Sequence, residues 1–163
     1  MSHHEVITPA GTDGTYGVVE FAHLAIGIVA IDEDGATYLV GQHRYPLDEF
    51  SWEIPEGGCG KSEQPLECAK RELREEAGLS ASSWTLLQTI HLSNSVTDEK
   101  GYIYLAEELA ACELNREDSE ADMHLQRLPF CDVHAKVLAS EITDVLSVAA
   151  ILRVGLERPG LLA

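Results

Sequence analysis

The segment that decides the fold is residues 54–79, which reads IPEGGCGKSEQPLECAKRELREEAGL. Pro65 suits the first turn of a helix, where its missing N–H costs nothing, and Gly78 suits the left-handed position that ends one. Between them, apolar residues recur at spacings of three and four, at Leu66, Ala69, Leu73 and Ala77. This period predicts a helix from Pro65 to Ala77 with one apolar stripe that faces the core.

Three glutamates of this helix, Glu72, Glu75 and Glu76, stand at positions i, i+3 and i+4. Carboxylates at this spacing project from one side and repel each other by a few tenths of a kcal/mol per pair. A divalent cation would offset the repulsion, and oxygen ligands favour Mg²⁺ or Mn²⁺ over zinc. The alternative is a solvated acidic face that is neutralised by basic neighbours, namely Lys70, Arg71 and Arg74.

A glycine-rich run precedes the helix and favours the first interpretation. Gly57, Gly58 and Gly60 permit close approach of the backbone and leave N–H groups and a carbonyl free to meet phosphate or metal. We therefore expect a phosphate- or metal-binding loop here.

The rest of the chain predicts an α/β layered domain with a mixed sheet, because strand-like segments flank one central helix and helical segments follow. Residues 1–17 are expected to form an arm or an edge strand, and residues 18–158 one domain. A hairpin is predicted from Val18–Ile31 and Thr37–Val40, which are joined by a turn at Asp32–Gly35. Further predicted elements are strands at Phe50–Ile54, Trp84–Leu92, Tyr102–Leu105 and Met123–Leu128, and helical structure from about Asp132 to Leu156.

Composition excludes several classes of function. The 163 residues include 28 acidic and 11 basic side chains, a net charge of −17, which repels nucleic acid and anionic membranes. A small anionic ligand is still possible if a bound metal inverts the local field. The four cysteines have no C-x-x-C spacing, so neither a zinc knuckle nor a thioredoxin-like site is expected, and Cys68 is expected to pack in the helix. With no signal peptide and no apolar span, we expect a cytoplasmic protein.

The spacing of identities in residues 57–79 matches a known motif without a gap. Gly57 is followed after five residues by Glu63, then after seven by Arg71-Glu72-Leu73, and then by Glu75-Glu76 and Gly78-Leu79. This pattern is the Nudix box, and the chain resembles the Nudix hydrolases. Residues 42–46, 52–55 and 140–144 are similar to the branch that contains ADP-ribose and nucleotide-sugar diphosphatases. The resemblance implies a Nudix α/β/α sandwich with a mixed β-sheet.

The resemblance also implies an activity and a metal site. Members of this branch hydrolyse the diphosphate of a nucleoside diphosphate linked to a sugar, releasing a nucleoside monophosphate and a sugar phosphate. The implied cofactor is Mg²⁺ or Mn²⁺, with Glu72 and Glu76 as principal ligands. Glu75 would be a further ligand or the base, and the carbonyl of Glu56 a backbone ligand. Glu63 and Arg71 would form an ion pair that supports the loop and the helix.

Three residues outside the box are implied in substrate binding and catalysis. Arg44 would bind the diphosphate, although a surface ion pair with Asp48 or Glu49 is the alternative. Trp52 would stack on the base, or pack in the core. Glu120, with Glu117 second, would be the general base in the acidic loop 116–122, unless that loop is only a solvated surface.

Other implications concern specificity and assembly. Members specific for ADP-ribose commonly carry a proline about fifteen residues after the box, whereas Ser93–Glu99 has none, which predicts broad activity on diphosphate sugars. A homodimer is expected, built with the N-terminal strands, with Val18–Ile31 and the C-terminal helix as contact surface. The alternatives are a nucleoside triphosphate or dinucleotide pyrophosphatase and a non-catalytic nucleotide-binding Nudix module.

Overall fold

The computed structural model describes residues 1–113 and 122–163. The strands are β1 (Ser2–Ile7), β2 (Asp13–Val18), β3 (His23–Ala30), β4 (Ala36–Arg44), β5 (Glu49–Glu53), β6 (Glu56–Gly60), β7 (Leu79–His91), β8 (Lys100–Ala111) and β9 (His124–Pro129). The helices are α1 (Pro65–Ala77), α2 (Phe130–Leu138) and α3 (Val145–Glu157), and a short 3₁₀ helix follows at Pro159–Leu162.

Two sheets form the centre of the molecule. One has the strand order β6-β3-β8-β7 and the other the order β5-β4-β9. The β3–β8 pair is parallel, with Ile28 opposite Tyr104, whereas β3–β6 and β7–β8 are antiparallel. The first sheet is therefore mixed, as predicted.

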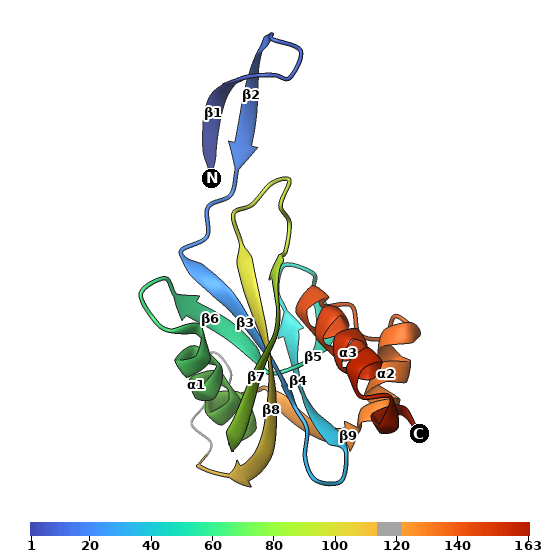
Figure 1. The fold of residues 1–163 in the computed structure, drawn as a ribbon. Helices are drawn as coiled ribbons and strands as arrows, with labels where there is room; N and C mark the ends of the chain where they lie inside the picture. The colour runs from blue at the N-terminus through green and yellow to red at the C-terminus, as the bar shows by residue number, and fades with distance from the viewer. Residues whose placement is uncertain (114–121) are drawn as a thin grey trace.

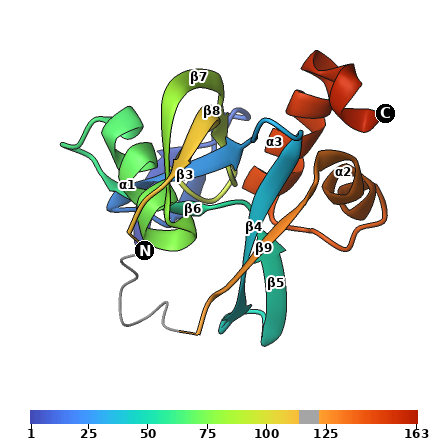
Figure 2. The same ribbon diagram turned by 90° about the horizontal axis from the view of Figure 1, so that it is seen from below.

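Helices cover both sides of the sheets, with α1 on one side and α2 and α3 on the other (Figures 1 and 2). Strand β3 contributes to both interfaces because successive side chains point to opposite faces. Ile26 and Ile28 pack with Leu73 of α1, whereas Val29 packs with Phe130 of α2 and Ile151 of α3. This arrangement confirms the predicted α/β/α layering.

Helix α1 follows its local signals closely. It begins at Pro65 and ends at Ala77, and Gly78 adopts the left-handed conformation with φ of 64°. The N–H of Gly78 reaches the carbonyl oxygens of Arg74 and Leu73, which satisfies the last turn. The predicted bounds of this helix are confirmed.

The predicted hairpin between Val18–Ile31 and Thr37–Val40 is wrong. The turn exists, but the pairing is a single bridge between Ile31 and Thr37. Both edges of β3 are already bonded, to β6 and to β8, so β4 crosses into the other sheet and pairs with β5 and β9.

One other expectation changes, at the glycine run. The glycine run forms strand β6, antiparallel to β3 with Cys59 opposite Leu24, and not a loop. The C-terminal helical segment is divided into α2 and α3, and Ser140, with φ of 59°, lies between them.

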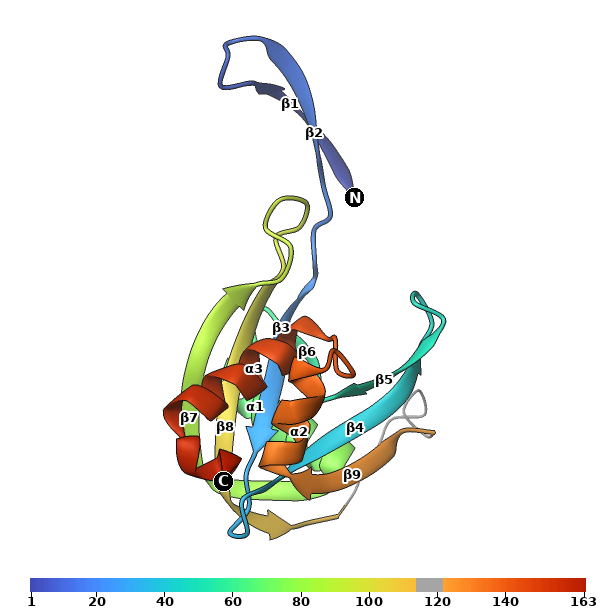
Figure 3. The same ribbon diagram turned by 90° about the vertical axis from the view of Figure 1, so that its right-hand side faces the viewer.

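Strands β1 and β2 form a two-stranded sheet of their own, which projects from the body (Figure 3). Strand β2 and the residue after it bond the β7–β8 connection: the Tyr16 hydroxyl donates to the Ser95 carbonyl at 2.5 Å, and the Val19 N–H donates to the Val96 carbonyl at 2.8 Å. The hairpin covers the residues predicted as an arm or edge strand. No helix within the described ranges is both long and apolar enough to cross a membrane.

Candidate active site

The site is built where strand β6 packs against helix α1. A Cβ atom on Gly57 would lie 2.2 Å from the carboxyl carbon of Glu72 and 2.3 and 2.4 Å from its oxygens. No side chain can occupy that space while Glu72 stays in place. Glycine is therefore required at position 57, so that the strand backbone can approach the carboxylate.

Glu72 and Glu75 of the helix line the same cavity, and Glu76 bonds the neighbouring strand. Glu72 and Glu76, one turn apart, are buried with exposed fractions of 5% and 2%. The Glu56 N–H donates to Oε2 of Glu76 at 2.8 Å, which joins strand β6 to the helix. Glu75 is only partly buried, and it lines a cavity together with Glu72.

Arg71 is the cation of this cluster. Its Nη1 is 2.9 Å from both Oε1 of Glu72 and Oε2 of Glu75, and its Nε is 3.6 Å from Oε1 of Glu63. Burial lowers the pKa of Arg71, but the hydrogen bond to Glu75 and the charge of Glu72 outweigh burial, so the pKa lies above its usual value. The predicted Glu63–Arg71 ion pair is present at the junction of loop and helix.

A chain of cavities leads away from this cluster. The first, of about 460 Å³, is lined by His23, Glu63, the site glycines and the acidic face of α1. The second, of about 310 Å³, shares His23, Gly57 and Gly58 with the first and adds Arg44, Glu56 and Asp144. A third, of about 290 Å³, continues past Arg44 and Glu53. An elongated ligand could therefore extend from the glutamates to the region around Arg44.

Arg44 is held by buried acids of the neighbouring strands. Its guanidinium bonds Glu53 through Nε at 3.0 and 3.1 Å and through a short Nη2 contact, and it meets Glu56 at 3.1 Å. The hydrogen bond to Glu53 is the main reason that its pKa is raised. The alternative prediction for Arg44 was a surface ion pair with Asp48 or Glu49. The structure gives Arg44 other partners, and Asp48 pairs with His43 at 3.3 Å.

Glu56 carries an unusual carboxyl group. Burial, together with the negative charges of Asp144 and Glu53, raises the pKa of Glu56 well above the usual glutamate range. Its Oε1 meets Arg44, whereas Oε2, in the part of the chain that the structure describes, is buried without a hydrogen-bond partner. A buried carboxylate oxygen without a partner is costly, and a bound proton or cation would remove that cost.

Helix α3 fixes the start of strand β6. Asp144 caps the helix by accepting the Ser147 N–H at 2.7 Å, and the Ser147 hydroxyl accepts the buried N–H of Ile54 at 2.9 Å. Asp144 and His23 line the cavities but were not predicted as site residues. The sequence does contain a local signal for Asp144, because an acid directly before an apolar helix is typical of an N-cap. His23 belongs to no recognisable motif.

One predicted residue of the described structure, Trp52, is not brought to this cluster. Trp52 packs against Gly41 and, with ring centroids 5.3 Å apart, against Phe50, and it is not among the lining residues of the three cavities above. Glu120 and Glu117 lie outside the described residues.

The residues present fit a hard divalent cation. Glu72 and Glu75 line the first cavity with Gly57, and Glu56 and Glu76 are joined by a hydrogen bond at the same junction of strand and helix; these residues offer oxygen ligands, which Mg²⁺ and Mn²⁺ prefer. Arg44 and Arg71 supply two positive charges against Glu72, Glu75, Glu76 and Glu53. The excess of negative charge, the close approach at Gly57 and the unpartnered oxygen of Glu56 all agree with a cation at this place.

Comparisons with known proteins agree with the geometry. The model of the NUDIX domain matches residues 22–142. The chain is 36% identical to an ADP-ribose pyrophosphatase of Mycobacterium tuberculosis, over 94% of this chain and 75% of the relative, and 33% identical to an ADP-ribose pyrophosphatase of Bacillus subtilis, over 78% and 69%. The crystal structure of an ADP compounds hydrolase superposes with a TM-score of 0.83 at 20% identity, covering 98% of this chain and 93% of the other, a likeness of fold.

Proposed function

The chain belongs to the NUDIX family, and from this premise we propose that it hydrolyses the diphosphate of ADP-ribose or a similar nucleoside diphosphate sugar. The products would be a nucleoside monophosphate and a sugar phosphate. Two relatives that match most of the chain are named ADP-ribose pyrophosphatases, which supports this substrate class. The observation that carries the proposal is the buried Glu72, set against Gly57 at the first cavity, with the buried Glu76 one turn further along the helix and bonded to the Glu56 N–H.

We propose Mg²⁺, or Mn²⁺, as the cation. Glu72 and Glu76 would be its principal ligands, with Glu75 and the carbonyl of Glu56 beside them. When bound, the cation polarises a phosphoryl oxygen and lowers the pKa of bound water. The chain itself supplies the rigid carboxylates and the glycine backbone, which allows a diphosphate to approach.

The rest of the substrate would lie along the second and third cavities. Arg44 lines both and would contact the diphosphate or sugar, although its ion pairs with Glu53 and Glu56 already orient its guanidinium. Trp52 stays a prediction for base stacking, and that role would require the base to bind beside strand β5.

A substrate panel tests the reaction. Purified protein with Mg²⁺ should release AMP from ADP-ribose and ADP-glucose, and the missing loop proline predicts activity on GDP-mannose too. Preference for ATP or diadenosine compounds would favour a triphosphate or dinucleotide pyrophosphatase, and ligand binding without turnover would favour a non-catalytic module. A profile confined to ADP-ribose would contradict the predicted breadth.

Glu72→Gln and Glu76→Gln test the metal site within the same assay. Each should lower turnover by several orders of magnitude, because an uncharged amide is a poor ligand, while circular dichroism stays unchanged. Glu67→Gln is the matched control, since this glutamate of the same helix is exposed and pairs with Lys70 at 2.8 Å. Undiminished activity in either variant, or in excess EDTA, would rule out the assignment.

We propose Glu120 as the general base, with Glu75 as the alternative. Oε2 of Glu75 already accepts a hydrogen bond from Nη1 of Arg71 at 2.9 Å, and the same carboxylate is a proposed ligand of the cation. Glu120→Gln should reduce kcat by roughly 10²–10⁴-fold with little change in substrate affinity. An unchanged kcat in Glu120→Gln, together with a large loss in Glu75→Gln, would assign the base to Glu75.

A further inference from the structure

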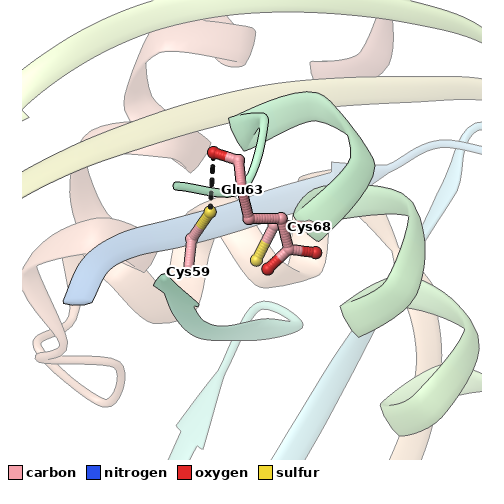
Figure 4. Close-up of side chains that lie close together, drawn as sticks. All are labelled: Cys59, Glu63 and Cys68. Atoms are coloured by element: carbon pink, nitrogen blue, oxygen red, sulfur yellow. Dashed lines mark hydrogen bonds between the residues drawn. The ribbon is translucent and has the colours of Figure 1, made fainter. Parts of the chain in front are cut away.

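Two cysteine thiols lie together where strand β6 meets helix α1 (Figure 4), and the proposed hydrolysis does not use them. Cys59 belongs to strand β6 and Cys68 to the first turn of α1, and both side chains are fully buried. Glu63, from the connection between these elements, lies beside them. The two sulfurs and a carboxylate oxygen of Glu63 all lie within 4.8 Å of one another.

We propose that Cys59, Cys68 and Glu63 form a second cation site, selective for a soft divalent ion such as Zn²⁺. Tetrahedral zinc with Zn–S bonds of about 2.3 Å holds two sulfurs roughly 3.8 Å apart, so the two sulfurs need to close by at most about 1 Å. Carbonyl oxygens of Gly60 and Glu63, 3.7 and 3.9 Å from the Cys59 sulfur, or a water molecule, could take the fourth position.

The surroundings give the ion a path and the site its charge. Glu63 lines the first cavity and its side chain is 37% exposed, so it can meet an entering cation before the buried sulfurs do. Nη2 of Arg71 lies 3.2 Å from the Cys68 sulfur and would stabilise a thiolate there. Two thiolates and one carboxylate carry three negative charges. Two of these charges neutralise a divalent ion, and the third can be neutralised by Arg71.

Without a cation the same residues have an ordinary structural role. Burial raises the pKa of both the Cys59 and the Cys68 thiols, so at neutral pH they are protonated and pack with Leu73 and Ile26. Binding of Zn²⁺ would form two Zn–S bonds and release both thiol protons to solvent.

Ligand chemistry keeps this site apart from the glutamate cluster. Sulfur ligands select Zn²⁺ over Mg²⁺, whereas an all-oxygen site suits Mg²⁺ or Mn²⁺. The two sites are nevertheless neighbours, because the Cys68 sulfur is 3.9 Å from Oε1 of Glu72. Spectroscopy must therefore distinguish sulfur from oxygen ligands.

Cobalt provides that distinction without any measurement of activity. Full-length protein, freed of metal by EDTA and kept reduced, is titrated with Co²⁺. We expect a thiolate-to-cobalt charge-transfer band in the near ultraviolet and strong visible bands of tetrahedral cobalt, saturating at one equivalent. Zn²⁺ should abolish both sets of bands, and excess Mg²⁺ should not.

Variants assign the ligands. Cys59→Ser/Cys68→Ser should lose the charge-transfer band, Glu63→Gln should weaken cobalt binding but keep it, and Cys112→Ser/Cys131→Ser, which alters the other two free cysteines, should behave as the parent. If the double variant unfolds, Cys59→Ala alone serves, with the same expected loss. Cobalt binding without a charge-transfer band, or a band that persists in the Cys59 variants, would overturn the proposal.

Discussion

Single residues determine whether the glutamates can gather, and Gly57 is the most sensitive of them. Its backbone occupies the position that lets the Glu72 carboxylate lie against strand β6. The helix alone places Glu72 and Glu76 on one side, but only the missing side chain at position 57 allows Glu72 to be buried beside the strand.

Gly57→Ala should therefore inactivate the protein with little loss of fold. The new methyl group would meet the Glu72 carboxyl group at 2.2 Å, and moving that group by about 1 Å can cost on the order of 10²-fold in rate. Steady-state hydrolysis of ADP-ribose with Mg²⁺ measures the change. Gly17→Ala is the control, because it is also in a strand and has nothing within 4 Å of its added carbon.

A Gly57→Ala variant with parental turnover would show that Glu72 is free to move without effect. In that case the close approach would be a packing feature and the cation would depend on other ligands.

Sequence predicts those site residues whose geometry is local. Glu72, Glu75 and Glu76 follow from helical spacing, and the Glu63–Arg71 pair from the Nudix resemblance. The meeting of Cys59 with Cys68 could not be predicted, because it depends on how strand β6 packs on the helix and not on a short cysteine spacing. For Arg44, likewise, the buried partners Glu53 and Glu56 come from neighbouring strands.

At the scale of elements, helix α3 supports the site from a distance. The Ser147 hydroxyl accepts the N–H of Ile54, and this residue precedes the strand that carries Glu56 and Gly57. Both Ile54 and Ser147 are fully buried, so no water replaces this hydrogen bond if it is lost.

Ser147→Ala should lower the free energy of unfolding by about 1–3 kcal/mol, the cost of a buried donor without a partner. For a chain of this size the melting temperature should fall by roughly 2–4 °C per kcal/mol. Thermal unfolding measures the change. Ser80→Ala is the control, because the exposed Ser80 hydroxyl bonds a carbonyl that solvent can reach. Equal melting temperatures for the two variants would contradict the role of Ser147.

Elements with local start and stop signals were predicted best. Pro65 and Gly78 define α1, and the bounds agree with the structure. Strand pairing is not local, which is why the hairpin prediction failed: β3 bonds to β6 and β8, both far along the chain. The glycine run becomes a strand for the same reason, since β3 offers it an edge.

The expected homodimer remains a proposal at the scale of the whole molecule, but its contact surface must change. Residues 26–31, predicted as contact surface, are central in the sheet and buried to 7% exposure or less. In α3, Ile151 and Val154 are also buried, whereas Leu156 stays exposed. The β1–β2 hairpin is the better candidate, since a two-stranded sheet is only marginally stable alone and this one projects with Ile7 and Tyr16 exposed (Figure 3).

Pairing of two copies through this hairpin would cover its exposed apolar side chains and its open strand edges. Light scattering at micromolar concentration should therefore give twice the 17.8 kDa of one chain. Deletion of residues 1–17 should return the protein to a single chain while α1 and the buried glutamates keep their structure, because the core does not include the hairpin. A parent protein with a mass of only 17.8 kDa by light scattering would contradict the dimer. A truncated protein that still has the mass of two chains would place the contact elsewhere, and the exposed end of α3 would be the next surface to alter.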